Sequence, residues 1–456
     1  MWLKRILPGL FLATSAFAFE LDLVVEGPIL HLSWPGQSPN AVYNVLRGSE
    51  LNSLNTWPPA VVGLSSNSWS TTDDSATQFF RVESIDRGLL LETNLLGVVT
   101  AAEITASSLG FGFTTPASFD VAYYQIAYQS VDVHGRALAC SGAFALPLST
   151  STHPLVSFQH GTLVRADEAP SDVNSFYTIP GFILAGHGYH CVLPDFPGLG
   201  TAADGSLHPF MISEANAISV VDGLRAAEDL LEALGRADDW NDQLFLAGYS
   251  QGGQVTLAAQ RLIEAEHPEY AVTASAPMAG PYDLSGTMLD TMLNTNQTYG
   301  APWFLPYVLF SYQEAYGLYS NVADVLLEPY ATDLPPLFDH QHGSGAIDAV
   351  MPTIPALIFK PEYLLAVKHN PNHPLRQALQ ANDLLDWAPQ APTQLYHCAA
   401  DELVPVANSQ VALNAFQLNG APDVSLIDPS PTSGHSGNCI TRGLVDAKLW
   451  FDTLRQ

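Results

Sequence analysis

Two different periodicities divide the chain into an N-terminal and a C-terminal part. Up to residue 95, apolar and polar positions alternate, so that Leu30, Leu32 and Trp34 fall on one face of a strand. Residues 41–48 have the composition of a further strand. Pro, Gly, Asn and Ser separate these runs, and no helical period appears. We therefore expect residues 19–95 to form a small all-β sandwich.

From about residue 115, strand-like runs alternate with helical ones. The clearest helix is expected over residues 217–235, where apolar residues recur at steps of three and four and Gly235 supplies a stop. The strand-like runs cover residues 123–133, 137–147, 155–160, 189–196, 243–250, 272–280, 393–401 and 423–430. This alternation predicts an α/β domain over residues 96–456, with a mostly parallel eight-stranded sheet covered by helices on both faces.

One interval between strands is too long for an ordinary crossover. About 110 residues separate Gly280 from Thr393, whereas a crossover needs roughly 10 to 12 residues. The interval has a residue pattern typical of helices and is rich in aromatic residues. We therefore expect a helical cap inserted over about residues 281–390.

The first 18 residues have the order of features found in an export signal. Lys4 and Arg5 precede an apolar run over residues 6–14, and Ala16 and Ala18 form a small-x-small cleavage site. The alternative is a buried first strand or helix. No later run reaches the roughly 18 apolar residues that a membrane helix requires. We therefore expect a signal peptide over residues 1–18, a secreted or periplasmic protein and no transmembrane segment.

The net charge limits the kinds of partner that the protein can bind, and the cysteine content indicates the redox compartment in which it folds. The 16 Lys and Arg against 45 Asp and Glu give a net charge of −29, which argues against nucleic acid and anionic membranes as partners. An exported chain with an even number of cysteines is expected to form disulfides, here two bridges. The alternative is free buried thiols. The four residues are Cys140, Cys191, Cys398 and Cys439.

The stretch "AGYSQGG" at 247–253 places Ser250 between glycines, after an apolar strand and before a helix. A strand that turns directly into a helix strains the corner residue and exposes its side chain. The same turn directs the backbone N–H of Gln251, at the start of the helix, toward developing negative charge. These features predict that Ser250 is a nucleophile. The alternative is a glycine-rich turn without chemistry.

A serine nucleophile requires a base and an acid, which in such a sheet follow it in the order acid, then histidine. Asp401 comes at the end of the penultimate predicted strand, and we prefer it to the adjacent Glu402. Among the later histidines, only His435 lies in a loop of small residues after the last strand. Because the acid and histidine loops must then be neighbours, a bridge between Cys398 and Cys439 becomes geometrically reasonable.

Two further expectations follow from the same arrangement. Cys140 and Cys191 fall on strands that would be adjacent, which favours a second bridge between them. The loop after the third strand, "SFQHGT", is expected to supply the second oxyanion donor through the Thr162 N–H, with His160 holding the loop. Thr162 and Gln251 thus form the predicted oxyanion hole. We expect no metal and no cofactor.

These residues resemble two known families. Trp34, Tyr43 with Arg47, and "FFRVES" at 79–84 resemble a fibronectin type III module. From about residue 115 the chain resembles the α/β-hydrolase superfamily and, within it, the secretory lipase group of lipase A-like enzymes. That second resemblance is carried by "HGT" at 160–162, "GYHCVLPDFPGLG" at 188–200, "HPF" at 208–210, "VVDGLRAAEDL" at 220–230, "GYSQGG" at 248–253, Asp401 in "AADELVP" and "GHSGNC" at 434–439.

The resemblance implies an α/β-hydrolase fold, ester hydrolysis through an acyl-enzyme on Ser250 without a cofactor, and a cap between the sixth and seventh strands. The substrate would be an ester or a lipid. The fibronectin-like module is not part of that group's usual pattern, so its adhesion to a polymer or lipid surface is a separate expectation. The cap is either a lid that opens at an oil interface or a rigid cover that shapes a pocket for small soluble esters. The chain alone leaves these two alternatives open.

Three other functions compete with a secreted esterase or lipase. A serine exopeptidase on the same fold needs acidic cap residues that grip a substrate amine, and the acidic residues of the cap are scattered. An extracellular polyester depolymerase would use the N-terminal module to adhere to the solid. A non-catalytic binding protein would not need a complete set of triad candidates.

Overall fold

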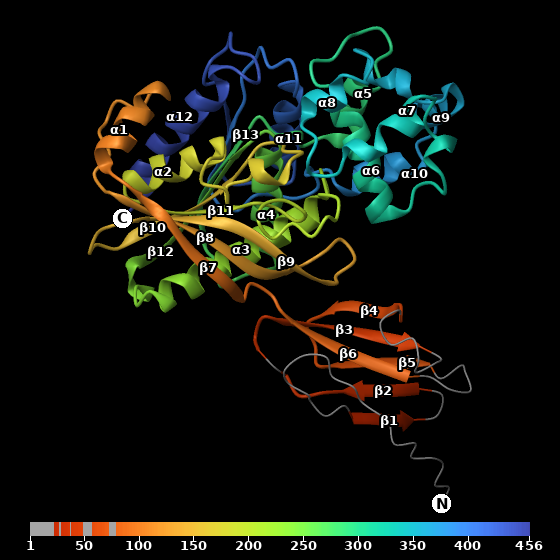
Figure 1. Cartoon of the computed structure of the whole chain (residues 1–456), viewed down its shortest axis with the longest axis horizontal. Helices are drawn as coiled ribbons and strands as arrows, with labels where there is room; N and C mark the ends of the chain where they lie inside the picture. Colours follow the sequence, from red (N-terminus) through yellow and green to blue (C-terminus); the bar gives the residue numbers. More distant parts are fainter. Residues whose placement is uncertain (1–21, 27–28, 37, 49–56, 73–78) are drawn as a thin grey trace, which may run out of the picture. The chain divides into compact units, whose positions relative to one another are not determined.

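The computed structural model describes residues 22–26, 29–36, 38–48, 57–72 and 79–456 (Figure 1). The predicted signal peptide, residues 1–18, lies outside the described residues. The chain forms two compact units, one of which takes in the chain up to Gly88 together with Gln129–Leu138. The other combines Leu89–Tyr128 with Ala139–Gln456.

The N-terminal unit contains two three-stranded antiparallel sheets, in the orders β1-β2-β5 and β4-β3-β6. The side chains of Leu32, Trp34, Tyr43 and Val45 pack together between them, and the rings of Trp34 and Tyr43 meet edge to face with centroids 5.3 Å apart. These small sheets agree with the predicted all-β unit, and the likeness to a fibronectin type III module stays a prediction. The strands are β1 (Asp22–Glu26), β2 (Ile29–Ser33), β3 (Ala41–Gly48), β4 (Pro59–Leu64), β5 (Ser68–Thr72) and β6 (Phe79–Asp86).

The C-terminal unit is built on a nine-stranded sheet with the order β15-β14-β13-β12-β10-β11-β9-β8-β7. The six strands from β15 to β11 are parallel, whereas β9 pairs antiparallel with β11, and β7 with β8. The strands are β7 (Leu90–Val99), β8 (Val121–Val131), β9 (Ala137–Pro147), β10 (His153–Gln159), β11 (His190–Pro194), β12 (Trp240–Tyr249), β13 (Val272–Met278), β14 (Thr393–Tyr396) and β15 (Val424–Ile427). The eight predicted strands correspond to β8–β15, so the α/β prediction is confirmed.

The ninth strand, β7, differs from the expectation of eight. Leu90–Val99 spans the expected boundary between residues 95 and 96, and it pairs with β8 at the edge of the large sheet. An edge strand has one neighbour and leaves much of its surface in solvent, as the exposed Leu91 and Leu95 of β7 show. Its pattern therefore resembles that of the sandwich strands before it.

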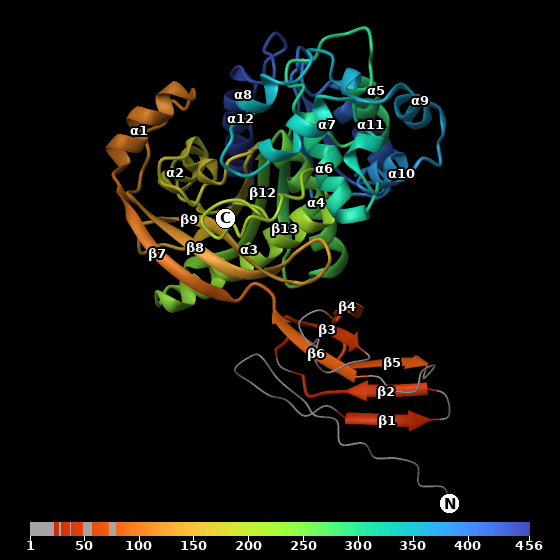
Figure 2. The same cartoon turned by 45° about the vertical axis from the view of Figure 1, so that its right-hand side comes forward.

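Helices cover both faces of the large sheet (Figures 1 and 2). On one face, Ile104, Leu184 and Phe451 belong to a core cluster formed with the strands by α1, α2 and α12. On the other face, Val220 and Leu257 belong to a cluster formed by α3, α4 and α11. These helices are α1 (Ala101–Gly110), α2 (Ile179–Gly186), α3 (Ser213–Ala233), α4 (Gln251–Glu266), α11 (Ala407–Leu418) and α12 (Asn438–Leu454).

The long interval between β13 and β14 forms the predicted helical cap. It contains α5 (Leu289–Met292), α6 (Phe304–Tyr316), α7 (Tyr330–Asp333), α8 (Ser344–Asp348), α9 (Pro361–His369), α10 (Pro374–Ala381) and the π-helical turn η5 (Leu284–Met288). The short 3-10 turns of the unit are η2 (Ala166–Glu168), η3 (Phe176–Thr178), η4 (Ala237–Asp239), η6 (Val322–Asp324), η7 (Pro335–Leu337) and η8 (Pro355–Ile358). Within the described residues, no helix has both the length and the apolar character needed to cross a membrane.

Of the two predicted disulfides, the structure contains Cys398–Cys439, with Cα atoms 6.0 Å apart. The predicted Cys140–Cys191 bridge is wrong, because Cys191 is a buried thiol whose pKa burial raises. The strands are adjacent as expected, but Cys191 faces Ala145 across the ladder. Cys140 lies five residues before Ala145, or about 17 Å away along the strand, and a disulfide requires Cα atoms within about 7 Å.

Candidate active site

Ser250 occupies the corner between β12 and α4. Its backbone has φ 61° and ψ −122°, a strained conformation for a residue with a side chain, and its N–H donates to the Met278 carbonyl at 2.9 Å. A Cβ on Gly252 would lie 2.0 Å from the Gln159 carbonyl oxygen. The helix therefore starts close to the sheet only because this position is glycine. The structure therefore contains the sharp strand-to-helix turn that the glycine-rich sequence around Ser250 predicts.

His435 lies in the loop between β15 and α12, and its ring lies between Ser250 and Asp401. Its Nε2 is 2.8 Å from Ser250 Oγ, and its Nδ1 is 2.6 Å from Asp401 Oδ2. All three residues are buried. Three side chains separated by up to 185 positions in the chain are thus joined by two hydrogen bonds.

The environment of Asp401 keeps its carboxylate charged. Its Oδ1 accepts from the backbone N–H groups of Leu403 at 3.0 Å and Val404 at 2.8 Å. Burial by itself raises the pKa of Asp401, but hydrogen bonds from His397 and His435 outweigh it and lower the pKa to about 2. A charged carboxylate next to Nδ1 can stabilise an imidazolium.

The neighbouring acid, Glu402, contacts the same histidine through the backbone. Its Oε2 accepts from the N–H of His435 at 3.0 Å. Asp401 therefore holds the imidazole ring of His435, and the adjacent Glu402 holds its main chain. The preference for Asp401 as the partner of the imidazole agrees with this geometry.

Sequence reasoning missed two supporting residues. His397, fully buried at the end of β14, has Nε2 3.4 Å from Asp401 Oδ2 and 2.8 Å from the Val404 carbonyl oxygen. Tyr249 donates its hydroxyl to the His435 carbonyl at 2.6 Å. Tyr249 directly precedes Ser250, and His397 lies four positions before Asp401. This closeness in sequence to predicted catalytic residues was the only feature that could have pointed to them.

The predicted oxyanion residues lie on two different elements beside Ser250. Gln251 is the first residue of α4, and Thr162 follows β10 in the loop that His160 supports. The ring nitrogens of His160 lie 2.6 Å from the Gly161 carbonyl oxygen and 2.9 Å from that of Asp195. Burial lowers the pKa of His160 to about 4, so the ring is neutral at physiological pH and its single N–H can donate to only one of these two carbonyl oxygens.

A second buried histidine contacts the side chain of Gln251. His208 Nε2 is 2.6 Å from Gln251 Nε2, and His208 Nδ1 is 2.9 Å from the Pro197 carbonyl oxygen. Because a carbonyl can only accept, Nδ1 carries the proton, and Nε2 accepts from the amide of Gln251. Burial lowers the pKa of His208 to about 3, which agrees with the neutral tautomer.

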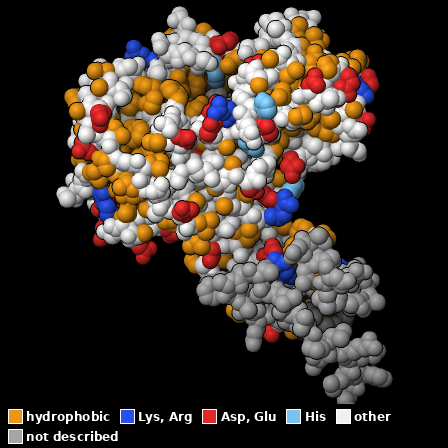
Figure 3. Space-filling model, in the orientation of Figure 1, with side chains coloured by type: hydrophobic (Ala, Val, Ile, Leu, Met, Phe, Trp, Pro, Cys, Tyr) orange, Lys and Arg blue, Asp and Glu red, His pale blue; other side chains and the backbone are white. Residues whose placement is uncertain are grey.

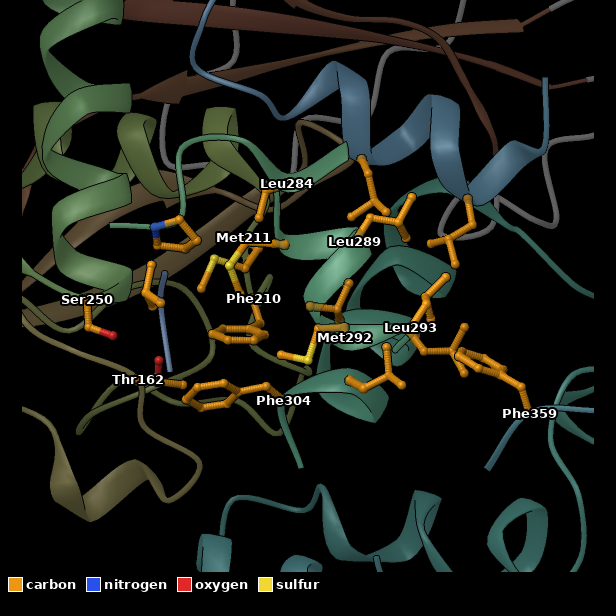
Figure 4. A pocket seen from close by; sticks show the side chains of 18 residues that line it. Thr162, Phe210, Met211, Ser250, Leu284, Leu289, Met292, Leu293, Phe304 and Phe359 are labelled. Carbon is orange, nitrogen blue, oxygen red and sulfur yellow. The ribbon is translucent and has the colours of Figure 1, made fainter. Parts of the chain in front are cut away.

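An apolar pocket of about 700 Å³ opens next to Ser250. Figure 4 shows Ser250 and Thr162 at one end and Phe359 at the other, with leucine and methionine side chains between them. Of its 18 lining residues, only Thr162 and Ser250 have polar side chains. Most of the others come from the cap, namely Leu284, Met288, Leu289, Met292, Leu293, Phe304, Leu305, Val308, Leu309, Phe359, Leu375 and Leu379.

A second hollow, of about 690 Å³, also reaches Thr162 but is more polar. Its lining includes Asp167, Glu168, Asn174 and Ser175 together with aromatic side chains. Within the residues that the structure describes, no group of three or more His, Cys, Asp or Glu side chains could hold a metal ion.

Comparison with solved structures finds similar α/β-hydrolases. The chain is 30% identical to the rice cell wall-degrading esterase LipA of Xanthomonas oryzae, with a TM-score of 0.72, over 81% of this chain and 98% of that one. It is 26% identical to a putative hydrolase of Legionella pneumophila, with a TM-score of 0.74, over 80% and 98% of the two chains.

A third likeness concerns the fold alone. Candida antarctica lipase A in its closed state is 18% identical, with a TM-score of 0.59, over 81% of this chain and 82% of that one. No protein-family model matches the chain, and no curated protein matches it. The chain therefore has the α/β-hydrolase fold that esterases and lipases share.

Proposed function

We propose that this chain, an α/β-hydrolase similar to the LipA esterase, is an exported serine hydrolase that cleaves carboxylic esters. The observation that carries the proposal is the hydrogen-bonded series Ser250–His435–Asp401 at 2.8 and 2.6 Å, beside an apolar pocket. The Cys398–Cys439 disulfide and the predicted signal peptide support export.

In the proposed reaction, His435 Nε2 takes the proton of Ser250 as its Oγ attacks the ester carbonyl carbon. The backbone N–H groups of Thr162 and Gln251 hold the resulting oxyanion. The bond to the alcohol oxygen then breaks, and His435 passes the proton to the departing alkoxide. Water attacks the acyl-enzyme with His435 again as base, which releases the carboxylic acid and restores Ser250.

The two hollows next to Thr162 suit the two halves of an ester. The apolar pocket would take the acyl group, since each buried methylene contributes about 0.8 kcal/mol. The more polar hollow would take the alcohol part. An exopeptidase substrate would need a carboxylate for its amine. The apolar pocket contains none, whereas Asp167 and Glu168 line the polar hollow, so a panel of substrates has to separate the two functions.

A panel of substrates tests the proposal directly. The purified protein should hydrolyse p-nitrophenyl esters from acetate to palmitate, and Ser250→Ala should lower kcat by about a thousandfold or more. Ser275→Ala, which changes a buried serine on the adjacent strand β13, should retain the activity of the parent. A fluorophosphonate should phosphonylate Ser250 with loss of fluoride, so the parent should gain the mass of the phosphonyl group and Ser250→Ala should not.

Two outcomes would contradict the proposal, and one would specify the ester. Faster cleavage of an aminoacyl anilide than of every ester would indicate the exopeptidase. Faster attack on a polymer emulsion than on soluble esters would indicate the polyester depolymerase, with the N-terminal unit as the element that adheres. No turnover of any substrate would indicate a binding protein.

A further inference from the structure

The loop that carries Thr162 is held from both sides. The ring of His160 spans the Gly161 and Asp195 carbonyl oxygens. From the cap, the Tyr307 hydroxyl donates to the Leu163 carbonyl at 3.1 Å. Thr162 lies between these two anchors, so its backbone and the first atoms of its side chain are fixed.

The hydroxyl of Thr162 has an unusual environment. Its Oγ1 is buried, and it has no hydrogen-bond partner among the residues that the structure describes. A buried hydroxyl without a partner costs about 1 to 3 kcal/mol, and such groups are rare in native structures. The branched side chain of threonine also limits its rotation toward another acceptor.

The position of the Thr162 hydroxyl indicates which group of a bound substrate it could bind. Among the described residues, Thr162 alone lines both the apolar pocket and the polar hollow, so it lies where the acyl and alcohol halves of an ester would meet. Figure 4 shows Thr162 and Ser250 at the same end of the apolar pocket. The ester carbonyl would occupy this junction during attack by Ser250.

We infer that the Thr162 hydroxyl donates a hydrogen bond to the oxyanion, as a third donor beside the backbone N–H groups of Thr162 and Gln251. This inference rests on the proposed ester hydrolysis. The hydroxyl hydrogen can rotate toward the developing charge, and a bond to a charged oxygen is about twice as strong as one to a neutral carbonyl. The gain is therefore realised in the transition state and affects kcat more than KM.

Thr162→Val tests this inference because it removes the hydroxyl and keeps the branched shape and the backbone N–H. We expect kcat for a p-nitrophenyl ester to fall about a hundredfold, with KM changed less than about twofold. Thr162→Ser, which restores a hydroxyl, should recover most of kcat. Because the lost hydroxyl has no partner among the described residues, the melting temperature of Thr162→Val should equal or exceed that of the parent.

Thr393→Val is the matched control. The buried Thr393 hydroxyl, at the start of β14, donates to the Ala391 carbonyl at 2.9 Å and lines neither hollow, so its removal should lower the melting temperature and leave kcat unchanged. If Thr162→Val keeps kcat within about twofold while the parent hydrolyses esters, the inference fails and the proposed function stands. If Thr162→Ser is as slow as the valine variant, packing is responsible and the inference also fails. A parent without ester hydrolysis would end both.

Discussion

Buried titratable residues around the site respond to their surroundings in opposite directions. Burial lowers the pKa of His160 to about 4 and that of His208 to about 3, because a charged ring finds no compensating carboxylate there. Burial raises the pKa of Asp195 to about 6, although hydrogen bonds from Ser141 and Ser171 partly offset it. Asp401, which receives hydrogen bonds from two histidines, is held near a pKa of 2 and stays charged.

These shifts predict how the free energy of unfolding depends on pH. The two histidines have folded pKa values below the ordinary 6.5, so the unfolded chain takes up protons first as the pH falls. Their contribution is complete above pH 6.5 and is lost as the pH falls toward 4 and 3. Asp195 acts in the opposite sense between pH 3.8 and about 6, whereas burial also lowers the pKa of His190 to about 4, in the same sense as the other two histidines. We therefore expect lower stability at pH 5 than at pH 7.5.

Urea unfolding at the two pH values measures this difference. His208→Gln should reduce the loss between pH 7.5 and pH 5, because glutamine does not titrate. His369→Gln, which changes an exposed histidine at the end of α9, serves as the control. Equal or greater stability of the parent at pH 5 would show that the buried histidines are not neutral.

Among the elements, helix α6 decides how the cap is attached. Ser311 Oγ donates to the His208 carbonyl at 2.8 Å, and the Tyr312 hydroxyl donates to the Met211 carbonyl at 3.1 Å. The ring of Tyr307 stacks on Phe210 with centroids 4.4 Å apart. All of these groups are buried, so opening the cap would break several bonds and expose apolar surface. The rigid cover is thus the better-supported alternative.

A rigid cap predicts that the enzyme is not activated at an oil interface. The initial rate with tributyrin should rise smoothly and saturate, without a step where the substrate exceeds its solubility. The paired variant Ser311→Ala with Tyr312→Phe removes two of the bonds that fasten α6 and serves as the comparison. A sharp rise in the rate of the parent at the solubility limit would contradict a fixed cap.

For the molecule as a whole, stability and solubility have different sources. The net charge of −29 comes from few basic residues, and Figure 3 shows acidic side chains scattered over the visible face rather than gathered in one patch. From such a surface we expect repulsion from anionic membranes. The Cys398–Cys439 disulfide, in contrast, ties the loop that carries Asp401 to the start of α12, just after the His435 loop.

Removing this disulfide should lower the global stability. The bridge closes a segment with a sequence separation of 41, for which loop entropy predicts about 4 kcal/mol. We expect Cys398→Ala with Cys439→Ala to lower the melting temperature by several degrees and to retain most of kcat at 25 °C. Reductant should lower the melting temperature of the parent and leave that of the double variant unchanged. An equal response of both proteins to reductant would contradict the expected role of the bridge.

The sequence by itself determined the features that depend on neighbouring residues. The strand–glycine–helix pattern around Ser250, the eight strands β8–β15 and the helical cap follow from local periodicity and turn chemistry, which residues close in the chain impose on one another. The placing of Asp401 and His435 also followed, because parallel strands bring their carboxyl ends to one edge of the sheet.

Only the tertiary structure decided the features that depend on register and packing. The distinct contacts of Asp401 and Glu402 are set by how the His435 loop packs against both. Cys140 and Cys191 lie on adjacent strands, but the register separates them by several residues. The pairing of β7 with β8 and the burial of the Thr162 hydroxyl likewise arise from contacts between distant segments. No local pattern records such contacts, because they exist only once the sheet, the loops and the cap are assembled.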